Sequence, residues 1–315
     1  MTDNLIISMN VVFPLFIIMA LGYILRHKGA TTREFNEIAN KLCFQLILPI
    51  SIFNSITTNG IRNSINARLS FWGVALFLGI TAFSLVPVLA STKDPAKRGV
   101  LLQCAVRSNF VYIGLPIVEN LFGEKGSAVT AGMLPVVVIV YNVAAVIILA
   151  AFSGGTAKLS FKGMMLSIVR NPLIIGAVLG VLYSLTGLPM PTLLDNSLSS
   201  IGKMATPLAL LSLGGNFEFK AFGKNLGYIA FGTAMRNIIT PLVALAAAIL
   251  LGFRGPELCV LFVEFAAPVA ISSYPMAAQM NGDGELAGQL VVSTTALSIA
   301  TMFVGVFVLK SFGWM

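Results

Sequence analysis

Two apolar runs of the chain each contain a helix-breaking stretch whose residues suit the binding of a charged solute. The first reads Asn-Phe-Val-Tyr-Ile-Gly-Leu-Pro from Asn109 to Pro116, and the second reads Pro-Val-Ala-Ile-Ser-Ser-Tyr-Pro from Pro268 to Pro275. Both runs are long enough to cross a membrane, where freed backbone N–H and C=O groups need partners from protein or a wet cavity. Paired interruptions of this kind in corresponding positions of two halves indicate the binding site of a secondary transporter.

The first stretch carries groups that favour an anion. The amide of Asn109 offers two donors and one acceptor just before Gly114. Pro116 is placed to start a new half-helix, whose first N–H groups and positive dipole end suit a carboxylate. The alternative is a kink that only shapes packing, since Gly and Pro are frequent in membrane helices. The matching break in the second stretch favours the binding site.

Hydroxyl and amide groups elsewhere extend the candidate site. Ser272 and Ser273 could hold a coupling cation or water, although each could instead bond back to its own helix. Polar groups in two other runs are read either as helix-to-helix hydrogen bonds or as secondary site residues. The substrate-binding candidates are Asn109, Tyr112, Gly114, Leu115, Pro116, Tyr141, Asn142, Pro268, Val269, Ser272, Ser273 and Asn54.

Three charged residues lie well inside apolar runs. A charge at the bilayer centre costs several kcal/mol unless it is paired or wet. Arg236 and Glu264 are the natural pair, either as a salt bridge that ties two helices together or with Glu264 as a titrating carboxylate that couples proton movement. Arg107 is expected to neutralise either Glu119 or the substrate.

The composition excludes a soluble globule. Of 315 residues, 57% are hydrophobic and 10% charged, and the mean hydropathy is +0.91, whereas soluble domains are roughly 25% charged. The net charge of +8 is dispersed between the apolar runs, so no nucleic-acid partner is expected. Cys43, Cys104 and Cys259 have no metal-ligand or redox spacing. We expect no cofactor beyond a coupling ion, H+ or Na+, and no enzyme.

Apolar stretches of about 20 residues predict ten membrane-spanning helices. They are Leu5–Leu25, Phe35–Thr57, Leu69–Leu89, Val100–Leu121, Ala128–Phe152, Met164–Leu185, Pro191–Leu213, Leu226–Leu251, Pro256–Gln279 and Leu286–Lys310. Loops after the odd-numbered spans hold ten Lys and Arg residues, against five in the other loops and the C-terminal end. The positive-inside rule therefore places both termini outside the cytoplasm in a multi-pass protein of the cell membrane.

The two halves of the chain repeat each other. A shift of 158 residues superposes Pro14 on Pro172, Gly22 on Gly180, Gly29 on Gly187 and Pro49 on Pro207. Each half has five predicted spans, and copies with an odd number of spans lie in opposite orientations. We therefore predict an all-α membrane protein of two inverted five-helix repeats, residues 1–153 and 162–315, in which the broken helices four and nine cross.

The segments Ser108 to Pro116 and Ala266 to Tyr274 resemble those of the auxin efflux carrier family, which includes bacterial relatives of the plant PIN carriers. The resemblance covers nearly the whole chain. It implies a fold similar to that of bile acid/sodium symporters. Spans one, two, six and seven would form a scaffold with a homodimer contact, and spans three to five and eight to ten a moving transport domain.

The resemblance also implies a function. Asn109, Gly114, Pro116 and Pro268 fall on the family's crossover positions, and Tyr141 lies near its span-five substrate contact. We expect an elevator-type secondary transporter of a small organic carboxylate anion. The alternatives are a sodium-coupled symporter of an amphipathic acid, and an anion channel or sensor.

Overall fold

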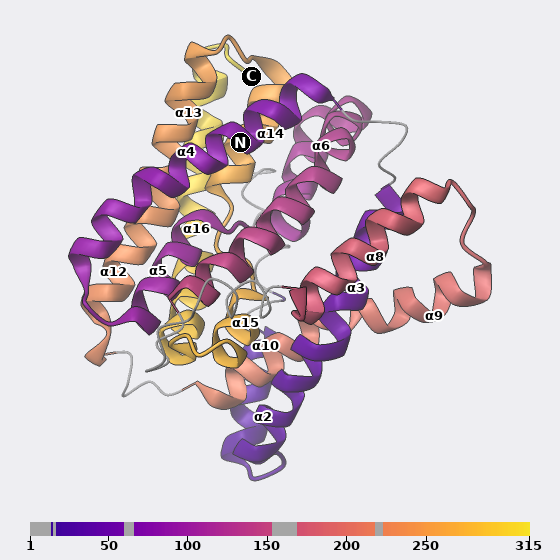
Figure 1. Ribbon diagram of the computed structural model, residues 1–315. Helices are drawn as coiled ribbons and strands as arrows, with labels where there is room; N and C mark the ends of the chain where they lie inside the picture. Colours follow the sequence, from indigo (N-terminus) through magenta and orange to yellow (C-terminus); the bar gives the residue numbers. More distant parts are fainter. Residues whose placement is uncertain (1–13, 15–16, 60–65, 153–168, 218–222) are drawn as a thin grey trace.

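The computed structural model describes residues 14, 17–59, 66–152, 169–217 and 223–315, which fold almost entirely into helices (Figure 1). These residues form no strand, and their only bridge of the β type joins Ser108 to Val269. The predicted spans Leu5–Leu25 and Met164–Leu185 fall partly outside the described residues. The predicted join at 153–161 falls wholly outside them.

Five helices of the described chain are long and apolar enough to cross a membrane. They are Arg33–Thr58, Ala67–Ser91, Ala128–Ala151, Leu226–Leu250 and Gly284–Ser311. Their bounds agree with those of five predicted spans to within two residues. The chain is therefore a nearly all-helical protein with several helices suited to a membrane.

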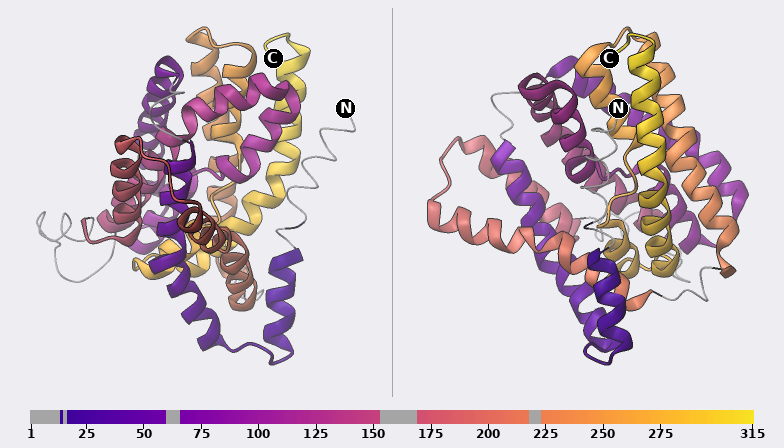
Figure 2. Two further views of the ribbon diagram at one scale, coloured as in Figure 1. Left: turned by 90° about the vertical axis from the view of Figure 1, so that its right-hand side faces the viewer. Right: turned by 180° about the vertical axis from the view of Figure 1, so that it is seen from behind.

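The helices pack as two groups. The first group contains α2 (Arg33–Leu42), η1 (Cys43–Ile47), α3 (Leu48–Asn59), α8 (Pro172–Thr186), α9 (Thr192–Lys203) and α10 (Ala205–Asn216). Within it, α3 packs on α8 and α9, and α2 packs on α10. The predicted span Pro191–Leu213 is divided at Met204, and α9 projects to one side, away from α16 (Figure 2).

The second group contains ten further helical segments of the described chain. They are α4 (Ala67–Ser91), α5 (Pro95–Val106), η2 (Phe110–Gly114), α6 (Leu115–Ala151), α12 (Leu226–Ala234), η3 (Met235–Ile239), α13 (Thr240–Leu250), α14 (Gly255–Ala266), α15 (Ser273–Gln279) and α16 (Gly284–Ser311). This group meets the first where α6 contacts α3 and α8, and where α15 contacts η1, α2 and α10.

Two helical runs of the second group are interrupted, and their interruptions cross. The chain is extended between α5 and η2 and again between α14 and α15. The two extended segments run antiparallel, with the Asn109 N–H donating to Pro268 O at 2.8 Å and the Ala270 N–H donating to Arg107 O at 3.2 Å. Each extended segment therefore supplies hydrogen-bond partners for part of the other segment's main chain.

The first interruption lies earlier than the sequence predicts. Residues 107–109 are extended, whereas Gly114 and Pro116 lie in helix. A Cβ built at Gly114 would come 2.6 Å from the Cγ1 atom of Val263. Gly114 therefore serves the close approach of η2 to α14, and it does not open the backbone. The turn between the predicted fourth and fifth spans is made at Gly123, which has a φ of 57°.

The contact between α3 and α8 depends on a small residue. A Cβ built at Gly176 would lie 2.5 Å from Pro49 O. We expect Gly176→Ala to lower the free energy of unfolding by about 1–3 kcal/mol through overpacking, measured as a lower melting temperature in detergent. Gly79→Ala is the matched control, because nothing lies within 4 Å of a Cβ there. Equal melting temperatures for the two variants would contradict this packing.

Candidate functional site

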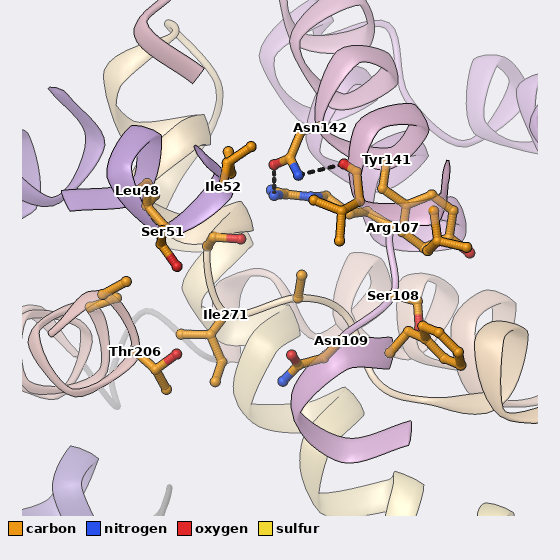
Figure 3. A pocket seen from close by; sticks show the side chains of 17 residues that line it. Leu48, Ser51, Ile52, Arg107, Ser108, Asn109, Tyr141, Asn142, Thr206 and Ile271 are labelled. Atoms are coloured by element: carbon orange, nitrogen blue, oxygen red, sulfur yellow. Dashed lines mark hydrogen bonds between the residues drawn. The ribbon is translucent and has the colours of Figure 1, made fainter. Parts of the chain in front are cut away.

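A cavity of about 110 Å³ lies where the extended segments cross, between the two helix groups (Figure 3). The first group lines it with residues of α3 and α10, and the second group with the crossing segments and α6. Its polar lining residues are Ser51, Arg107, Ser108, Asn109, Tyr141, Asn142, Thr206 and Ser272. A solute in this cavity would touch both groups at once.

Arg107 places a buried positive charge in the cavity. Arg107 is 5% exposed, and its Nη2 donates to Asn142 Oδ1 at 2.8 Å. Its Nη1 contacts Ser273 Oγ at 3.5 Å and the sulfur of Met276. All of these partners are neutral. Among the described residues, the ion pairs are Arg33–Glu37 and Lys97–Asp283, so Arg107 has no carboxylate partner there.

The alternative partner weighed for Arg107, Glu119, is exposed and forms no ion pair in the described part of the chain. The expectation that Glu119 neutralises Arg107 is therefore wrong. Because an unpaired charge is costly to bury, the guanidinium is suited to receive an anion.

Asn109 lies across the cavity from Arg107 and Asn142 (Figure 3). It is 4% exposed, and its Nδ2 has no hydrogen-bond partner among the residues described, nor does the hydroxyl of Ser108. Buried polar groups without a partner are rare and call for an explanation such as a missing ligand. The cavity therefore presents both a cation and unused donor groups.

The half-helix that follows Asn109 begins at Phe110, not at Pro116 as predicted. The Ile113 N–H donates to Asn109 O at 3.1 Å, so the first helical bond starts there. Phe110 lines the cavity. The positive end of this half-helix dipole therefore faces the cavity wall, which also favours an anion.

Tyr141 and Asn142 of α6 have different roles. Asn142 accepts from Arg107, and its Nδ2 donates to Val138 O at 2.7 Å, which fixes the orientation of the amide (Figure 3). Tyr141 lines the cavity, but its hydroxyl donates to Glu264 Oε1 at 3.1 Å. Asn142 thus orients the buried guanidinium, whereas Tyr141 links the cavity wall to a buried carboxyl group.

The bond between Tyr141 and Glu264 should matter for stability. The other oxygen of Glu264, Oε2, has no partner among the described residues. We expect Tyr141→Phe to lower the free energy of unfolding by about 1–3 kcal/mol, because Glu264 loses a hydrogen bond while it stays buried. Thermal unfolding measures this, with Tyr183→Phe, whose hydroxyl bonds at an exposed site, as the control. Equal effects of the two substitutions would contradict the assignment.

The predicted ion pair of Arg236 with the Glu264 side chain is not formed. Arg236 instead donates to main-chain carbonyl oxygens: Nε to Ala267 O at 2.7 Å, Nη1 to Ala105 O at 3.2 Å and Nη2 to Glu264 O at 3.1 Å. The physical reason is that the interrupted helices leave carbonyls without N–H partners, which attract a multiple donor. The salt-bridge prediction was wrong.

The other candidates are distributed around the crossing. Pro268 and Val269 make the main-chain contacts with Asn109 and Ser108, Ser272 lines the cavity, and Ser273 contacts Arg107. Asn54 lies elsewhere, since its Nδ2 packs against the position of Gly202 in α9 and it does not line the cavity. The side chains of Tyr112, Leu115 and Pro116 lie outside the described part of the structure.

Sequence reasoning missed part of the cavity wall. It left the role of Arg107 open and did not propose Ser108 or Thr206, which also line the cavity. A signal existed for Arg107, because an arginine deep in an apolar run indicates function. No comparable signal marked Thr206, which reaches the cavity through the packing of α10.

A wider cavity of about 950 Å³ opens between α2, α10, α15 and α16. Charged residues line it, among them Arg26, Arg33, Glu37 and Glu285. Across it, Asn216 of α10 donates to the Tyr274 hydroxyl at 3.0 Å. This cavity forms a polar vestibule along the seam between the helix groups.

Comparisons with known proteins agree with a transport role. A family model described as a membrane transport protein matches residues 7–306. An uncharacterized transporter of Methanocaldococcus jannaschii is 26% identical, with 98% of each chain covered. The uncharacterized transporter YfdV of Escherichia coli K12 is 24% identical over 85% of this chain and 87% of its own. A probable auxin efflux carrier component 1b of Oryza sativa is 30% identical over 36% of this chain and 22% of its own.

Proposed function

We propose that this chain, which belongs to the membrane transport protein family of the auxin efflux carriers, moves a small organic carboxylate across the cell membrane as a secondary transporter. One observation carries the proposal. Arg107 is buried beside the crossing of two interrupted helices and has no carboxylate partner among the described residues. An anionic solute supplies the missing charge.

The cargo carboxylate binds between the two walls of the cavity. Arg107 donates to its oxygens, because a guanidinium matches a carboxylate in geometry and charge. The unpartnered Nδ2 of Asn109 and the hydroxyl of Ser108 offer further donors. The proposal names a small carboxylate because the cavity measures only about 110 Å³.

The architecture proposed for this carrier has ten spans in two inverted repeats, residues 1–153 and 162–315. The first helix group, with the first predicted span, is the scaffold, and it carries the homodimer contact. The second group is the transport domain. Because the cavity lies between the groups, movement of the second group along the first carries the cargo across, which is an elevator mechanism of alternating access.

The residues that line the vestibule suggest which side of the membrane it faces. It is lined by Arg26, near the end of the helix Ile17–His27, and by Arg33, the first residue of α2. The positive-inside rule places this end of the two helices in the cytoplasm, with both termini outside. In this proposal the vestibule opens toward the cytoplasm.

A binding screen and a flux assay test this function together. Small mono- and dicarboxylates are added to the purified protein, and the melting temperature is followed, with amines of similar size as controls. A carboxylate should raise the melting temperature saturably and show counterflow in liposomes. Saturable counterflow excludes a simple channel. Binding without any flux would indicate a sensor, and no effect of any carboxylate would contradict the proposal.

A further inference from the structure

Arg236 holds the ends of both interrupted helices. It lies in η3, between α12 and α13, and it has no exposed surface. Its three guanidinium nitrogens reach the carbonyl oxygens of Ala105, Glu264 and Ala267 at 2.7 to 3.2 Å. Ala105 belongs to the last turn of α5, Glu264 to the last turn of α14, and Ala267 to the extended segment after it.

Two of these carbonyls lack their usual helical partners for identifiable reasons. The carbonyl of Glu264 would pair with the residue four positions later, but that residue is Pro268, which has no N–H. The carbonyl of Ala105 would pair with the N–H of Asn109, which donates instead to Pro268 O. Carbonyl oxygens without an N–H partner therefore lie close together at the crossing, where a donor or a cation can bind them.

The electrostatics of this place favour a cation. Two helix C-terminal ends, each with a partial negative charge, converge there. In transporters built from interrupted helices, such ends and unwound carbonyls coordinate the coupling Na+ or H+. Here a guanidinium makes those contacts, and no carboxylate of the described chain forms an ion pair with it. The carboxyl of Glu264 is turned toward Tyr141 and the position of Gly73.

We propose that Arg236 is a resident cation that occupies the place of an alkali coupling ion, so that this protein binds no Na+ or K+ at the crossing. Unlike a bound ion, this positive charge remains on the protein throughout the transport cycle. As a consequence, cargo binding and movement need no alkali ion. Only this consequence rests on the proposed transport function, because the ion-binding claim is tested without any cargo.

The wild-type protein gives the first test. It is purified in choline chloride, and its melting temperature is compared in choline, sodium and potassium chloride at equal ionic strength. Binding of radioactive sodium is measured in parallel. The expected result is the same melting temperature in the three salts and no saturable sodium binding. A saturable rise in melting temperature specific to Na+ or K+ would overturn the proposal.

A variant tests the replacement itself. Arg236→Ala frees the three carbonyl oxygens, so we expect a lower melting temperature in choline and a saturable recovery in Na+ or K+. Arg107→Ala is the matched control, because it also removes a buried arginine. Its melting temperature should be the same in choline, sodium and potassium chloride. A stable Arg236→Ala protein with equal melting temperatures in all salts contradicts the proposal. If the variant folds in no salt, the wild-type result decides.

Flux then separates the two proposals. Counterflow of a carboxylate that binds should run at the same rate in sodium and in choline. If counterflow occurs only in sodium, the proposed role of Arg236 is overturned, but the transport function still stands. Absence of carboxylate binding in every salt contradicts the transport function, and the sodium-binding result then still stands on its own.

Discussion

Replacement of Arg107 by glutamine is expected to abolish carboxylate binding. Glutamine keeps a polar side chain but removes the positive charge that has no carboxylate partner in the described chain. Loss of one member of a buried charge pair costs about 2–5 kcal/mol, which corresponds to about 30-fold weaker binding or more. Titration calorimetry on the purified protein measures this with the best carboxylate from the screen.

Two further substitutions make the Arg107 result specific. Arg107→Lys keeps the charge but not the paired donors, so we expect binding weaker than wild type and tighter than in Arg107→Gln. Arg254→Gln removes an exposed arginine whose hydrogen bonds are to nearby main-chain carbonyls, and it should bind as the wild type does. Wild-type affinity in Arg107→Gln would remove Arg107 from the site.

Asn109→Asp should block the site from within. The substitution changes one amide into a carboxylate of nearly the same shape, in the same cavity as Arg107. The new charge repels an anionic cargo and offers Arg107 an internal partner. We therefore expect loss of carboxylate binding together with an unchanged or higher melting temperature, because the Nδ2 that is removed has no partner among the described residues.

Asn109→Ala distinguishes charge from shape. It removes the amide without adding a charge, and it should abolish binding while the protein stays folded. Binding calorimetry and thermal unfolding are measured on the same samples. If the aspartate variant binds carboxylate with wild-type affinity, the cavity is not the anion site. If both variants unfold, the comparison moves to Arg107→Gln.

Much of the backbone plan is predictable from local sequence. The five long spans follow from apolar length alone, and their ends agree with prediction to within two residues. A break near Pro268 is likewise a local property, since proline lacks an N–H. The position of the other break is not local. Residues 107–109 are extended because they pair with the segment after α14, a long-range contact that periodicity does not reveal.

The wrong pairing of Arg236 has a clear cause. Sequence reasoning matches charged side chains with one another, because main-chain acceptors are invisible until helix ends are placed. Once Pro268 removes the partner of the Glu264 carbonyl, that carbonyl becomes a partner for Arg236. Asn54 is wrong for a different reason. Its amide is predicted to belong to the site but lies against Gly202 of α9, a contact set by how the helices pack.

A structure determined with a bound carboxylate tests the central claim most directly. The account predicts carboxylate density in the cavity at the helix crossing, with its oxygens within hydrogen-bond distance of the Arg107 guanidinium and the Asn109 amide. The density should disappear in Arg107→Gln prepared in the same way. Carboxylate density only in the vestibule, with the crossing cavity empty, would contradict the account.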